Sequence, residues 1–137
     1  MNAKFAVLVT SLAAIAGSVP VLAHHSFSAE FDANIAVDVT GTVTKIEWAN
    51  PHTFFYVDVR NGNGEYENWA MEMGSPNGLM RRGWTRNTLK IGDVVTVTGS
   101  RAKDGSLKGN ARSVTLADGK RLFAGSSQPD AEGAETN

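Results

Sequence analysis

The sequence predicts an all-β domain with one short helix, folded as a small OB-type barrel of five or six strands. Three observations predict this class. Apolar residues recur at every second position in several short runs, and Gly, Asn, Asp and Pro separate these runs. A single helix-like segment lies between the third and fourth runs, which is the order of an OB-type barrel. A small β-sandwich built from the same strands is the alternative.

The first 23 residues have the three-part pattern of a secretory signal peptide. Lys4 precedes an apolar run over residues 5–16, and Val21 and Ala23 occupy the small-residue positions of a cleavage site. The run is too short for a stable membrane span, and an N-terminal core helix is the alternative. We therefore expect cleavage after Ala23 and a periplasmic or secreted protein, with no membrane insertion once the signal is removed.

The mature chain has the size and charge of one ordinary domain. Cleavage leaves 114 residues, enough for a hydrophobic core, and removal of Lys4 leaves 12 basic against 14 acidic residues. This balance gives no electrostatic attraction to nucleic acid or anionic lipid, so we expect neither as a partner. The sequence contains no cysteine, which excludes disulfides and a cysteine-linked lipid anchor.

The β domain is predicted over residues 37–125. Its first strand alternates from Val37 onward but changes phase before Ile46, which predicts a bulge or bend between Gly41 and Ile46. Residues 24–36 form a separate N-terminal segment in this interpretation. Residues 126–137 are rich in Ser, Gly, Pro, Asp and Glu, and a disordered tail is expected there.

The second and third strands form a hairpin around the turn sequence RNGNGE, residues 60–65. Alternation places six side chains on their inward faces: Phe55, Val57, Val59, Trp69, Met71 and Met73. We favour core packing for the two methionines over soft Cu(I) ligation. Glu72 points the other way, where it borders a site or meets water.

One short helix is predicted after the third strand. Ser75 can cap it, Pro76 suits its first turn and Gly83 can close it. Leu79 and Met80 are expected to turn inward.

The remaining elements follow this helix. A fourth strand carries Val95 and Val97 on one face, and residues 111–116 and 120–123 form a closing hairpin. Between them, RAKDGSLKGNAR (residues 101–112) is interpreted as a polar, glycine-containing mobile loop.

Two groups of basic residues are candidates for anion binding. Arg81, Arg82 and Arg86 flank Trp84, and we favour a solvated helix face over a bidentate carboxylate or phosphate site. The second group lies in the predicted loop, at a position where OB barrels bind ligands: Arg101, Lys103, Lys108 and Arg112.

The histidines are the candidate metal ligands. His24 would begin the mature chain, and its amine and imidazole can chelate one metal ion. His52, in the NPHTFF loop between the first two strands, would supply a third nitrogen; three such nitrogens form a histidine brace and suit Cu(II). His25 is an optional ligand. The alternative is a mobile terminus with surface histidines.

Three aromatic residues near His52 form a candidate ligand face: Trp48, Phe54 and Tyr56. They would shield the metal, or stack on a ligand as exposed aromatics do in OB folds. We favour packing of Phe54 and Tyr56 under the N-terminal segment, because Phe27 and Phe31 of that segment need burial. Such packing would also carry the histidines toward the barrel.

Several motifs resemble a family of small exported proteobacterial proteins known as domain of unknown function 6152. They are AHHSF, GTVTKIEWANPH, NWAMEMGSPNGLMRRGWTRNTLKIGDVVTVTG and GNARSVTLADGKRLFAGSS, which together span most of the mature chain. The resemblance implies export and a single small β domain, and it brings no assigned activity or catalytic residue. A looser likeness to periplasmic OB-fold proteins is an analogy of fold alone.

We therefore expect a non-catalytic periplasmic protein that binds copper or another divalent metal through His24 and His52. Its role would be metal handling rather than turnover. The alternative is a metal-free OB-fold protein that binds a small molecule, glycan, peptide or partner protein. A histidine-brace copper oxidase is a third hypothesis, which requires an open coordination position and a substrate surface. No nucleophile–base pair, phosphate-binding loop or paired carboxylates point to a hydrolase.

Overall fold

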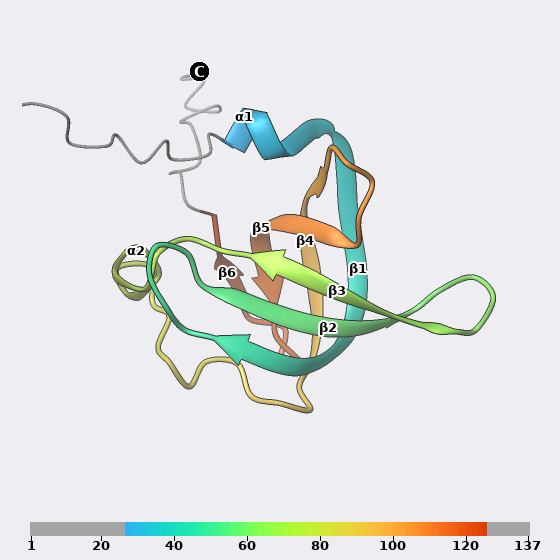
Figure 1. The fold of residues 1–137 in the computed structure, drawn as a ribbon. Coiled ribbons are helices and arrows are strands. Elements are labelled where there is room, and N and C mark those ends of the chain that lie inside the picture. Colours follow the sequence, from blue (N-terminus) through green and yellow to red (C-terminus); the bar gives the residue numbers. More distant parts are fainter. Residues whose placement is uncertain (1–26, 126–137) are drawn as a thin grey trace, which may run out of the picture.

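Six strands and two short helices make up residues 27–125, the part of the chain that the computed structural model describes (Figure 1). In chain order they are α1 (Phe27–Glu30), β1 (Phe31–Glu47), β2 (Phe54–Arg60), β3 (Tyr66–Glu72), α2 (Pro76–Met80), β4 (Val94–Ala102), β5 (Lys108–Thr115) and β6 (Arg121–Phe123). The all-β class is confirmed, with α2 as the expected short helix. The predicted signal peptide and tail lie outside these residues.

The strands form one sheet in the order β3-β2-β1-β4-β5-β6. A parallel pairing of β3 with β5, from Ala70 opposite Lys108 to Glu72 opposite Asn110, closes five of these strands into a ring. The short strand β6 pairs with β5 outside the ring. The ring agrees with the predicted five-stranded arrangement, whereas the alternative required two separate sheets.

β1 is long and bent, and it pairs with two strands of the ring, β2 and β4. Its first part pairs with β4 and its last part with β2, and the register shifts between Val43 and Lys45, which confirms the predicted bulge. Gly41 lies where β1 passes between both partners, and a Cβ atom there would be 2.5 Å from the Asp58 carbonyl oxygen. The strand begins at Phe31 rather than at Val37.

The core fills the ring with the side chains that alternation predicted. Phe55, Met71 and Met73 are almost completely buried. Ser75 caps α2 by accepting a hydrogen bond from the Gly78 amide, as expected. The inward position expected for Met80 is wrong: α2 buries Pro76 and Leu79, while Met80 is 51% exposed, because Met80 lies on the opposite side of this short helix.

The loop predicted over residues 101–112 is also wrong. β4 continues to Ala102 and β5 starts at Lys108, so only residues 103–107 connect them. Gly109, which the mobile-loop prediction included, is buried in β5. A Cβ atom there would be 3.1 Å from the Met71 sulfur, so the missing side chain allows close packing of strands.

Residues 27–125 contain no helix that is both long and apolar enough to cross a membrane.

Candidate functional site

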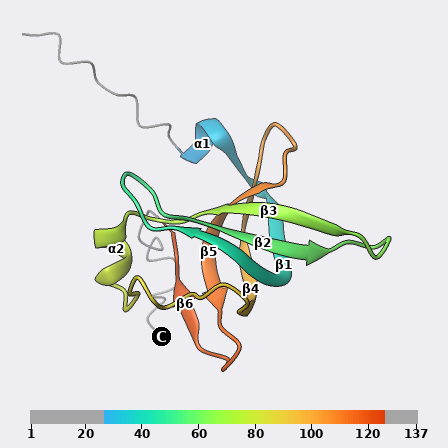
Figure 2. The same cartoon turned by 60° about the horizontal axis from the view of Figure 1, so that its bottom comes forward.

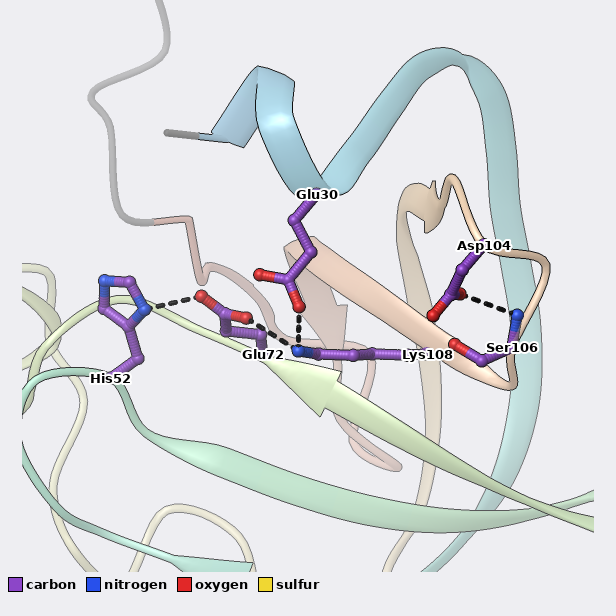
Figure 3. Close-up of polar contacts among 6 residues, drawn as sticks. All are labelled: Glu30, His52, Glu72, Asp104, Ser106 and Lys108. Carbon is purple, nitrogen blue, oxygen red and sulfur yellow. Dashed lines mark hydrogen bonds and ion pairs between the residues drawn. The ribbon is translucent and has the colours of Figure 1, made fainter. Parts of the chain in front are cut away.

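Four side chains with ionisable groups lie in a row between the β1–β2 loop and α1 (Figure 3). They are His52 from the loop, Glu72 at the end of β3, Lys108 at the start of β5 and Glu30 at the end of α1. His52 Nδ1 is 2.5 Å from Glu72 Oε1, Glu72 Oε2 is 3.5 Å from Lys108 Nζ, and Lys108 forms an ion pair with Glu30. We call these four residues the charged row.

The ring of strands brings the charged row together. Met71 and Met73 face the core, so Glu72 between them faces the other side of β3. The parallel pairing with β5 places Lys108 opposite Ala70, two residues from Glu72. Thr53 exchanges backbone hydrogen bonds with Met73 and Gly74, of 2.8 and 3.0 Å, and these fix the loop next to Glu72. The backbone pairing of β3 with β5 and the hydrogen bonds of Thr53 therefore place His52 next to Glu72.

Glu72 is the most buried member of the row, at 6% exposure. A buried carboxylate needs charged or hydrogen-bonding partners, and Lys108 and His52 supply them. Burial lowers the pKa of Lys108, but the hydrogen bond and charge of Glu30, together with the charge of Glu72, raise it more. The pKa of Lys108 is therefore above its ordinary value, and the side chain stays protonated at neutral pH.

The Glu72 contact orients the ring of His52. A carboxylate accepts, so Nδ1 is the nitrogen that donates to it, and the other ring nitrogen, Nε2, lies on the far side of the ring in Figure 3. The His52 side chain is 32% exposed. A carboxylate bound to one imidazole nitrogen, with the other nitrogen accessible, is the usual arrangement of a metal-binding histidine.

Lys108 lies between the N-terminal segment and Phe54 and contacts aromatic rings of both. Phe31 is buried, as predicted. The burial expected of Phe27 is wrong: its ring stacks on that of Phe31 with a centroid distance of 5.7 Å, but the residue is 39% exposed. Lys108 Nζ lies 5.5 Å from the centroid of the Phe31 ring and 5.3 Å from that of Phe54. The Lys108 ammonium group therefore contacts one ring from β1 and one from β2, and Phe54 helps to fix the position of the N-terminal segment through this lysine.

The three aromatic residues of the predicted ligand face have different neighbours. Trp48 packs against the hydrophobic core. The Tyr56 hydroxyl donates to Glu47 Oε2 at 3.2 Å, and Lys45 Nζ lies 5.1 Å from its ring centroid. Phe54 and Tyr56 share one face of β2, whereas Trp48 belongs to a different cluster.

The basic groups also separate. Arg82 donates to the Gly125 carbonyl oxygen at 3.0 Å and lies over the Phe123 ring, so it anchors the end of the sheet. Arg81 and Arg86 are exposed. Arg101 lies over the Trp69 ring.

His24 and His25 lie outside the described residues, so the metal hypothesis keeps only His52 as a located ligand. Within residues 27–125, no three or more histidine, aspartate or glutamate side chains are grouped so as to hold a metal ion. The sequence pointed to His52 and to the outward direction of Glu72, but not to Lys108 and Glu30 as their partners. One signal was present: Glu72 is an acidic residue between two core methionines.

A protein-family model, described as a family of unknown function (DUF6152), matches residues 12–111. The matched range contains all four residues of the charged row. No curated protein matches the chain.

Proposed function

The chain belongs to the DUF6152 family, whose description assigns no activity, and from the geometry we propose a metal-binding function. In this proposal it is an exported, non-catalytic periplasmic protein that binds copper or a similar divalent ion. His52 Nε2 is one ligand, and the amine and imidazole of His24 supply the others after cleavage behind Ala23. His25 is an optional ligand.

The observation that supports the proposal is the contact between His52 and buried Glu72. The carboxylate fixes the imidazole orientation and makes Nε2 a stronger donor toward a metal. Lys108 holds the second oxygen of the same carboxylate, so Glu72 cannot easily rotate away. A nitrogen-rich ligand set of this kind suits Cu(II).

The metal-free alternative would use Trp48, Phe54 and Tyr56 as a ligand face. It has less support because Trp48 packs on the core and the Tyr56 hydroxyl is bonded to Glu47. The charged row has a more specific geometry than this face, and we therefore place the function there.

His52→Ala is expected to weaken Cu(II) binding by about 100-fold, because it removes a ligand that the protein holds in place. The measurement uses chain exported to a bacterial periplasm, with mass spectrometry confirming a start at His24. Competition titration gives the affinity, and the EPR spectrum after one equivalent of Cu(II) should show axial coordination by three nitrogens. A chain extended by one methionine should lose this spectrum.

Asn63→Ala is the matched control, since Asn63 is an exposed residue at the tip of the β2–β3 turn. It should bind copper as the unchanged chain does. Glu72→Gln should weaken binding by about 10-fold to 100-fold, as loss of a carboxylate behind a metal ligand does. Weak copper binding that His52→Ala leaves unchanged would overturn the proposal.

A further inference from the structure

We propose that Arg101 and Trp69 together form a binding site for a carboxylate group. Trp69 lies on the core side of β3, and Arg101 lies near the end of β4. The guanidinium carbon of Arg101 lies 5.3 Å from the centroid of the Trp69 ring, so the charged group covers the indole. Neither residue belongs to the charged row, and the site needs no metal. Binding there is therefore independent of the proposed metal site.

Two buried N–H groups of this pair have no acceptor. Arg101 Nε and Trp69 Nε1 are shielded from solvent, and neither has a hydrogen-bond partner among residues 27–125. Trp69 is 7% exposed, so bulk water does not serve its indole freely. A buried donor without an acceptor is destabilising, because it has lost its hydrogen bonds to water and gained none in return. Ligand oxygens bound beside the pair would supply these hydrogen bonds, which favours binding.

The positive charge of Arg101 has no anionic partner among the described residues. Its side chain donates to the Gly105 carbonyl oxygen at 2.8 Å, and it takes part in none of the ion pairs of residues 27–125. Asp32 stands opposite Arg101 in the pairing of β1 with β4, but its carboxylate accepts from the Asn34 amide at 2.9 Å. Partly buried charges in proteins are normally paired. A bound anion would compensate the charge of Arg101.

The donors favour a carboxylate over other anions. One positive charge matches a monoanion, whereas a phosphate dianion or a sulfate would bring surplus negative charge into a largely buried place. A chloride ion is a single acceptor atom, but a carboxylate offers one oxygen to each of the two donors. Arginine also binds carboxylates with favourable planar geometry. The same group occurs in a free small acid and at the C-terminus of a peptide.

A small acid can reach the pair by way of the β4–β5 connection. Residues 103–106 of this connection are exposed, and Figures 1 and 2 both show it standing out from the sheet beside the first part of β1. The hydrogen bond to Gly105 links the Arg101 guanidinium to this segment. Exposed segments with few buried contacts open locally at a small fraction of the free energy of global unfolding. Such opening gives a ligand access to donors that are otherwise covered.

The test follows the Trp69 indole N–H by NMR while sodium formate is added to the exported chain at constant ionic strength, without copper. Trp69→Phe identifies this signal among those of the three tryptophans. The Trp69 signal should shift saturably, with about millimolar affinity, because a ligand of so few atoms cannot bind more tightly. The Trp84 signal should not respond, since Trp84 Nε1 already donates to the Phe123 carbonyl oxygen. Sodium chloride and sodium phosphate should give no saturable shift.

Arg101→Met keeps the aliphatic part of the side chain and removes the charge and the Nε donor, so it should abolish the saturable shift. Arg112→Met is the matched control, because Arg112 is exposed on the neighbouring strand β5 and the change of charge is the same. It should bind formate as the unchanged chain does. Trp69→Phe keeps a ring in the core and removes only the second donor. Its affinity for formate, followed through the Gly105 amide signal, should fall about tenfold.

A Trp69 signal that formate leaves unchanged, as it would if a water molecule served these donors, overturns the carboxylate site. An equal response to chloride or phosphate overturns it as well, as does a formate response that Arg101→Met retains. If Arg101→Met does not fold, the comparison of the three anions and the loss in Trp69→Phe decide the question. Acetate and N-acetylglycine then distinguish the two sources: tighter binding of N-acetylglycine indicates a peptide C-terminus, and tighter binding of acetate indicates a free small acid.

Discussion

Replacing Gly99 with alanine is expected to destabilise the domain by about 3 kcal/mol, because the new methyl group has no space. A Cβ atom at this position would lie 1.9 Å from the carbonyl oxygen of Asn110 and 3.1 Å from the amide nitrogen of Arg112. These are backbone atoms of β5, so no side-chain rotation can relieve the overlap. β4 and β5 would have to separate where their register already shifts, between Thr98 and Gly99.

Urea denaturation followed by tryptophan fluorescence gives the free energy of unfolding. Gly62→Ala is the matched control, since a Cβ atom there would meet nothing within 4 Å. It should change the free energy by less than about 0.5 kcal/mol. Equal stability of the two variants would contradict the close approach of β4 and β5.

The alternation of side chains predicted the strands wherever one face is buried. β2 and β3 are the clearest cases: Phe55 and Met71 face the core as their positions required. The phase change in β1 predicted its bulge, because two opposite faces of one strand cannot both point inward. The helix cap at Ser75 was predicted from local chemistry alone.

The prediction of a long loop failed where a glycine serves packing rather than a turn. Gly109 lies in the paired strand β5, and only Gly105 of the predicted loop has a positive φ, 79°. The start of β1 was missed for a related reason. Its pairing with β4 is irregular between Asp32 and Ala36, so the residues there lack the alternation that marks a strand.

The charged row was beyond sequence reasoning because its contacts are long-range. Lys108 meets Glu30 across 78 positions, and it meets Glu72 only through the parallel pairing that closes the ring. His52 could be chosen because histidine is rare in this chain, with three in 137 residues. Its partner could not, since the position of Glu72 between two core methionines predicts only that it faces outward, as an acid that meets water also does.

Phe55→Ala is expected to destabilise the domain by about 3–5 kcal/mol, the cost of deleting a buried aromatic ring. Phe55 is completely buried, and its neighbour Phe54 is half-buried on the opposite face under Lys108. Phe54→Ala should therefore cost less, roughly 1–2 kcal/mol. The same urea measurement compares the two variants. Equal costs would mean that β2 is not divided between a core face and an outer face.

Phe54→Ala also separates the two candidate functions, because the substitution leaves the domain folded. If the protein binds a metal through His52, this variant should keep its Cu(II) affinity within a few-fold, since the ring contacts the lysine rather than the imidazole. If the aromatic face binds a ligand, loss of the ring should remove about 1–3 kcal/mol of stacking energy. His52→Ala should therefore weaken copper binding, whereas Phe54→Ala should leave it nearly unchanged. A large loss of copper binding in Phe54→Ala, at unchanged fold, would mean that the metal site extends to β2.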